Sequence, residues 1–189
     1  ETNQIGNLIL EAGSTLDGGG DISLTSQTVD VQGSWATGQS PLTVSGSSLN
    51  GVGMLTTSDG VAFSITNTNF GATVSNSGDA SFNSTNNTTN GAFTNEAAGS
   101  VVLENGTRLR LNDNDFTNAG SLTFADGPTQ TFLWENDAGS TGSFINALTG
   151  TVTVNGTGPR RFTCSTDNQG TMDLLATSTE FDNSSGTHA

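Results

Sequence analysis

The sequence predicts an all-β fold, a single-stranded parallel β-helix (β-solenoid), and two observations support this. The first is a repeat in which a glycine followed by a polar–apolar strand recurs at intervals of about twenty residues, a period typical of solenoids. The repeat begins at Gly13, Gly33, Gly53, Gly78, Gly99, Gly120, Gly150, Gly170 and Gly186. We expect about nine coils, wound right-handed because crossovers between parallel strands almost always are.

The second observation is a series of short runs with strictly alternating apolar residues, bounded by Gly, Asn, Asp or Ser. Such runs occur at 8–10, 22–24, 29–31, 42–44, 61–65, 109–111, 122–124 and 152–154. About three of them fit between successive repeat glycines, which indicates three strands per coil. Asn-Gly and Asp-Gly hairpin signals are present but do not separate every pair of runs, so an antiparallel sandwich is disfavoured.

An asparagine returns a few residues before the repeat glycine, and in the second half of the chain a phenylalanine stands two residues before that asparagine. The motif reads Phe93-Thr-Asn95, Phe116-Thr-Asn118, Phe144-Ile-Asn146 and Phe181-Asp-Asn183, with asparagine alone at Asn50, Asn76 and Asn168. In-register coils would stack these rings in the core and join the amides in a hydrogen-bonded ladder. The two long intervals, 53–78 and 120–150, predict loops that bulge from the solenoid.

The composition limits the functions that the chain can have. Hydrophobic residues are 31% of the chain and the net charge is −14, which alone could indicate disorder, but the alternating pattern argues against it. With only four basic residues, binding to nucleic acid through phosphate neutralisation is excluded. Arg108 and Arg110 should share one strand face and Arg160-Arg161 should lie in a loop, so neither pair is expected to form a basic patch.

A single cysteine, Cys164, excludes an internal disulfide framework and is expected to be a small buried residue. No apolar run is long enough to span a membrane as a helix. Residues 1–189 are expected to form one β-solenoid domain, a segment of a longer chain or filament, because both ends resemble the middle of a solenoid.

The repeated Phe-x-Asn followed by Gly-Ser/Thr-apolar-x-apolar resembles the β-helical stalk and passenger regions of large bacterial surface adhesins. Autotransporter passengers and filamentous-haemagglutinin-type adhesins are the nearest families. The resemblance implies a non-enzymatic, extracellular or cell-surface rod with a structural or adhesive role. Its expected partners are further copies, through the solenoid ends, and surface glycans, without nucleic acid or membrane insertion.

A carbohydrate-binding or carbohydrate-active β-helix, of tailspike or lyase type, is the alternative. Its candidate residues are Trp134, Glu135 and Asp137, which place a sugar-stacking ring beside two carboxylates in the interval 120–150. No catalytic residue is predicted, because the carboxylates do not recur at a shared strand position. A second alternative is an ice-binding solenoid, suggested by Thr151-Val-Thr153 and Thr66-Asn-Thr68.

Two further kinds of site are suggested by short motifs. Asn112, Asp113, Asn114 and Asp115 form an oxygen-rich turn that could bind Ca²⁺, the one possible cofactor. Six sequons for N-glycosylation occur, at Asn83, Asn86, Asn87, Asn105, Asn155 and Asn183.

Overall fold

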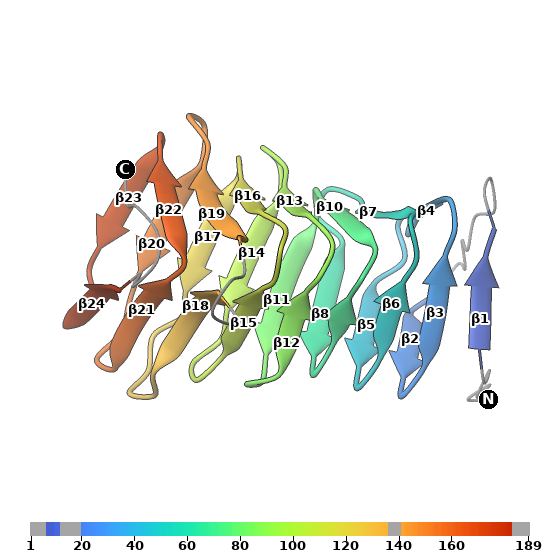
Figure 1. Cartoon of the computed structure of the whole chain (residues 1–189), viewed down its shortest axis with the longest axis horizontal. Coiled ribbons are helices and arrows are strands. Elements are labelled where there is room, and N and C mark those ends of the chain that lie inside the picture. The colour runs from blue at the N-terminus through green and yellow to red at the C-terminus, as the bar shows by residue number, and fades with distance from the viewer. Residues whose placement is uncertain (1–6, 12–19, 136–140, 183–189) are drawn as a thin grey trace.

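The computed structural model describes residues 7–11, 20–135 and 141–182, and its fold is a parallel β-solenoid. Strands stack along the long axis, with β1 and β24 at opposite ends of the rod (Figure 1). Each coil contributes one strand to each of three sheets, so sheets of nine, eight and seven strands correspond to about eight coils. The predicted fold class is confirmed.

The three sheets are described by their strands in order along the rod. The nine-stranded sheet contains β1 (Asn7–Leu10), β3 (Thr28–Val31), β6 (Ser48–Asn50), β9 (Asn69–Phe70), β12 (Asn87–Thr89), β15 (Arg108–Leu111), β18 (Thr131–Glu135), β21 (Pro159–Thr163) and β24 (Ser178–Phe181). The eight-stranded sheet contains β2 (Ile22–Thr25), β5 (Leu42–Ser45), β8 (Ala62–Thr66), β11 (Asp79–Asn83), β14 (Ser100–Leu103), β17 (Ser121–Phe124), β20 (Thr151–Val154) and β23 (Thr171–Leu174). The seven-stranded sheet contains β4 (Ser34–Ala36), β7 (Met54–Thr57), β10 (Thr73–Asn76), β13 (Phe93–Asn95), β16 (Phe116–Asn118), β19 (Ser143–Asn146) and β22 (Ser165–Asn168).

Alternation along each strand separates a buried core from a polar exterior. In β14, for example, Val101 and Leu103 are fully buried while Ser100 and Val102 are partly exposed. The pattern repeats because successive side chains of a strand point to opposite faces of its sheet. Cys164 lies in this core, as predicted. No helix of the described residues is long and apolar enough to cross a membrane.

The predicted loop in the interval 53–78 is wrong. The interval contains four strands, β7 to β10, because the repeat glycine moves from one sheet to another. Gly53 precedes β7 of the seven-stranded sheet, whereas Gly78 precedes β11 of the eight-stranded sheet. At both places a Cβ atom would meet a backbone oxygen of the preceding coil, 2.2 Å away at Gly53 and 2.3 Å at Gly78. Glycine is therefore required by close coil stacking in either position.

The predicted phenylalanine stack is confirmed for three of its four members. Phe93, Phe116 and Phe144 are aligned in β13, β16 and β19, and the first two rings are parallel at 4.9 Å between centroids. The assignment of Phe181 to this row is wrong. Phe181 lies in β24 of the nine-stranded sheet and stacks on Phe162, also at 4.9 Å.

The predicted asparagine ladder, here Asn76, Asn95, Asn118, Asn146 and Asn168, is also confirmed. Each Nδ2 donates to Oδ1 of the next member, at 2.9, 2.8, 2.8 and 2.7 Å in order. The first four side chains are fully buried. Asn50 does not belong to the ladder, since it ends β6 in the nine-stranded sheet, and Asn183 lies outside the described residues.

Candidate functional site: an arginine–aromatic strip

The residues predicted for sugar binding are only partly described. Trp134 and Glu135 are the last two residues of β18, and Trp134 pairs in register with Arg110 of β15 and Thr163 of β21. Asp137 lies outside the described residues. The carbohydrate hypothesis for these three residues therefore stays a prediction. The strands that pair with β18 on either side, β15 and β21, contribute residues to a different candidate site.

That site is a row of four residues on the outer face of the nine-stranded sheet, which we name the arginine–aromatic strip. Arg108 of β15 pairs in register with Phe132 of β18, Phe132 with Arg161 of β21, and Arg161 with Glu180 of β24. Arg110 lies two residues along from Arg108 on the same strand. The loop assigned to Arg160-Arg161 is wrong, because both residues lie in β21. That neither pair forms a basic patch stays a prediction, although the register brings Arg161 within two strands of Arg108.

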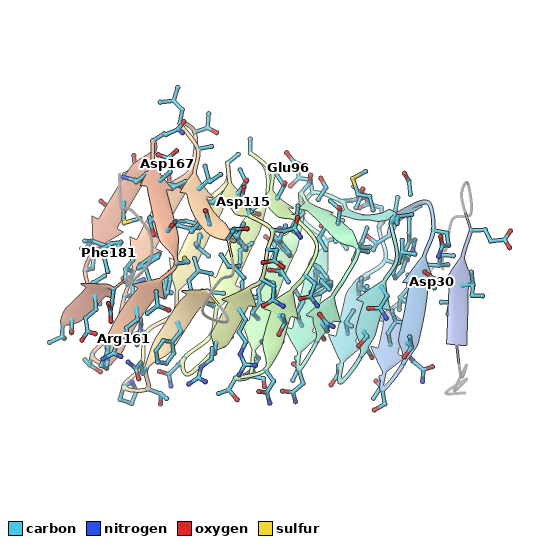
Figure 2. All side chains as sticks on the ribbon, viewed as in Figure 1. Asp30, Glu96, Asp115, Arg161, Asp167 and Phe181 are labelled. Carbon is cyan, nitrogen blue, oxygen red and sulfur yellow. The ribbon has the colours of Figure 1, made fainter. Side chains whose placement is uncertain are left out.

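Strand alternation holds the strip outside the core. Leu109, Leu133 and Phe162 are fully buried at the inward positions of β15, β18 and β21. The intervening Arg108, Arg110, Phe132 and Arg161 are therefore outward and are all partly exposed. In Figure 2, Arg161 lies at the lower edge of the rod, whereas Glu96, Asp115 and Asp167 lie in its upper part.

The strip is organised around the ring of Phe132. Cζ of Arg108 lies 4.8 Å from the centroid of this ring and Cζ of Arg161 lies 5.9 Å from it. Both distances are within the range of cation–π attraction, which contributes about 0.5–1 kcal/mol at exposed positions. Arg161 Nε also contacts Glu180 Oε2 at 2.7 Å. These side chains are 37% and 42% exposed, so solvent screening keeps the ion pair weak.

Arg160, the neighbour of Arg161, has the opposite environment. Its side chain is fully buried and donates to six backbone carbonyl oxygens, those of Ala125, Gly127, Thr129, Asn155, Gly158 and Pro159. Burial lowers the pKa of Arg160, and nearby Asp126 partly offsets this. Five of these carbonyls belong to the turns before β18 and β21, and that of Pro159 is the first in β21. Arg160 therefore joins two neighbouring coils and stabilises the fold.

The predicted calcium turn is held by hydrogen bonds with other parts of the rod. The side-chain amides of Asn112 and Asn114 donate to Oδ1 and to the backbone oxygen of Asn90, respectively. Oδ1 of Asp115 accepts from the backbone N–H of Ser143 at 3.0 Å, and Asp113 is exposed. Within the described ranges, no group of three or more His, Cys, Asp or Glu residues is placed to hold a metal ion. Ca²⁺ binding here stays a prediction, and the side chains are already used in pinning the turn.

The predicted glycosylation sites differ in accessibility. Asn83, Asn86 and Asn105 are exposed, Asn155 is partly exposed, and Asn183 lies outside the described residues. Asn87 is fully buried, accepts from the backbone N–H of Thr68 and donates to the backbone oxygens of Asn83 and Ser84. A glycan on Asn87 is incompatible with this fold.

The rows considered for ice binding are interrupted. Thr151 and Thr153 of β20 are aligned with Ser121 and Thr123, but on the other side Thr153 is aligned with Asp173. Thr68 is fully buried, so it shares no outer face with Thr66. Ice binding stays a prediction.

No protein-family model matches the chain, and no curated protein or solved structure matches it at a significant level. The resemblance to β-helical adhesin passengers is therefore supported at the level of the fold. The strip itself could not be found from the sequence, because its neighbouring residues are 24, 29 and 19 positions apart and only the register of four strands aligns them.

Proposed function

We propose that the chain is a non-enzymatic structural rod, a stalk or filament segment of an extracellular or cell-surface protein with an adhesive role. The observation that supports this most directly is the continuity of the stacking. Three parallel sheets run through the described coils along one axis, and an amide ladder joins five successive coils from Asn76 to Asn168. In a solenoid of this kind each coil is stabilised by its neighbours, so the structure resists bending and extends by adding coils.

The last described coil supports extension of the rod. Leu174 is aligned with the buried Val154 and Phe181 with the buried Phe162, yet Leu174 is 48% and Phe181 37% exposed. A further coil stacked on β23 and β24, from the same chain or from another copy, would bury both side chains and pair the strand edges.

The net charge of −14 is also consistent with a rod that does not associate side by side with other copies. Like charges keep neighbouring rods apart along their sides, so association is favoured at the ends, where apolar surface is available. The rod would then grow in length without bundling.

Electron microscopy of the native material at neutral pH tests this proposal. We expect rods longer than the roughly 40 Å that eight coils at 4.8 Å span. Compact particles no longer than this, in the native full-length protein as well as in the isolated segment, would contradict a structural rod.

A further inference from the structure

We propose that the arginine–aromatic strip binds a linear polysaccharide that carries carboxylates, a polyuronate lying along the solenoid axis. The proposal is independent of the structural role, because the strip is complete within β15, β18, β21 and β24 whether or not the rod grows longer.

The first argument is the distribution of positive charge. The chain has four basic residues and eighteen acidic ones. Three of the four basic residues, Arg108, Arg110 and Arg161, lie on one outer face within three adjacent strands, while the fourth, Arg160, is buried in the core. A protein with net charge −14 therefore has one outward place where cations are concentrated, and this place fits an anionic partner.

The second argument is the spacing along the strip. Neighbouring strands are about 4.8 Å apart, so Arg108 and Arg161, two strands apart, carry their charges at backbone positions separated by about 10 Å along the axis. Phe132 lies between them and contacts both guanidinium groups. The row is thus charge, ring, charge along the axis, so a linear polymer lying along it can present carboxylates to both guanidinium groups.

The third argument is chemical. A guanidinium group is planar and binds a carboxylate through two parallel hydrogen bonds, a geometry that an ammonium group cannot reproduce. The ring of Phe132 positions the two guanidinium groups, because each lies over it. A uronate polymer offers the matching partner, since each of its sugars has a carboxylate.

Glu180 indicates how a carboxylate approaches the strip. Its Oε2 lies 2.7 Å from Nε of Arg161, so the chain's own carboxylate takes the place that a ligand carboxylate would have. Because both side chains are more than a third exposed, this pair contributes little and can be displaced by a polyanion. Glu180 is therefore a competitor whose removal should strengthen binding.

A second copy of this chain is the less suitable occupant. A thin polymer approaches only the strip, where the side chains of Arg108, Arg110 and Arg161 are gathered, and charges farther than about 8 Å away are largely screened at physiological salt. Another copy would bring its own net charge of −14 against the whole side of the rod.

The test is calorimetric titration of the intact chain with a decamer of galacturonic acid at low salt, with neutral dextran and dextran sulfate as comparison polymers. Three variants are compared with the unaltered chain: the double variant Arg108→Gln and Arg161→Gln, the variant Phe132→Leu, and the variant Glu180→Gln. Asp59→Asn, at an exposed turn between β7 and β8, is the charge-matched control for Glu180→Gln. Circular dichroism and the melting temperature establish that each variant is folded.

We expect the double arginine variant to bind the uronate decamer at least tenfold more weakly and Phe132→Leu several-fold more weakly. Glu180→Gln should bind more tightly, while Asp59→Asn should bind as the unaltered chain does. Replacing both arginines by lysine should also weaken binding, because charge is kept but the two-bond geometry is lost.

Three results would overturn the proposal. The first is equal binding by the unaltered chain and by the folded double arginine variant. The second is arginine-dependent binding of dextran sulfate with none of the uronate decamer, which would show a site for sulfate instead of carboxylate. The third is concentration-dependent dimerisation, by sedimentation, that the double arginine variant abolishes, which would make the strip an interface between copies.

Discussion

The side-chain amide of Asn95 donates a hydrogen bond to Oδ1 of Asn118 across 2.8 Å, and both side chains are fully buried. The same Nδ2 also donates to the backbone oxygen of Ser121. An amide has two donor hydrogens and one acceptor oxygen, so one ladder position satisfies the inward polar groups of two neighbouring coils. The ladder is therefore a continuous row of polar side chains beside the apolar core, and each Nδ2 donates to the next asparagine in the same direction along the rod.

Replacing Asn95 by Ala should destabilise the solenoid by about 2–4 kcal/mol, because Nδ2 of Asn76 and Oδ1 of Asn118 both lose a buried partner. The midpoint of urea denaturation measures this. Asn168→Ala is the matched control, since Asn168 ends the ladder and is exposed. Equal shifts for the two variants would contradict a structural role for the buried amides.

Replacing Arg160 by Met should cost about 3 kcal/mol or more, because several backbone carbonyls buried around the guanidinium lose their donors at once. Arg161→Met removes a neighbouring cation of the same size on the outer face and should cost less than about 1 kcal/mol. Thermal or urea unfolding of the two variants tests the difference. Similar losses would mean that Arg160 is not the joint between coils that its contacts indicate.

Replacing Gly120 by Ala should strongly destabilise the rod. A Cβ atom at this position would lie 2.2 Å from the backbone oxygen of Gly99 and 2.3 Å from that of Glu96, so neighbouring coils would have to separate. At Gly20 a Cβ meets nothing within 4 Å, and Ala there should be neutral or slightly stabilising. The melting temperatures of Gly120→Ala and Gly20→Ala test this difference. An unchanged melting temperature for Gly120→Ala would contradict it and show that the coils can move apart.

Removal of divalent cations should leave the melting temperature unchanged, because hydrogen bonds with Asn90 and Ser143 already hold the turn at Asn112–Asp115. Asp115→Ala should cost about 1 kcal/mol through loss of the Ser143 bond, and the exposed Asp113→Ala should be neutral. A melting temperature that falls on addition of chelator and is restored by Ca²⁺ would instead establish the predicted calcium site.

The rows of Phe93, Phe116 and Phe144 and of their asparagines were predictable, since the same short motif recurs once in each coil. The same reasoning was wrong for Phe181, where the motif recurs but the chain has reached a different sheet. A local motif does not record which of three sheets the strand belongs to. The prediction of a loop between Gly53 and Gly78 was wrong for the same reason, because the two glycines precede strands of different sheets.

The sequence by itself determined the period, the three-strand coil, the inward apolar positions and the ladder, because these depend on spacing within one or two coils. Only the tertiary structure decided that Arg108, Phe132 and Arg161 form one strip while Arg160 is buried in the core. The physical reason is register. In a parallel solenoid a side chain's neighbours come from the coils above and below, and turns of unequal length set which residues align. Because Arg160 and Arg161 are successive residues of one strand, they point to opposite faces of the sheet, so Arg160 joins the coils while Arg161 faces outward.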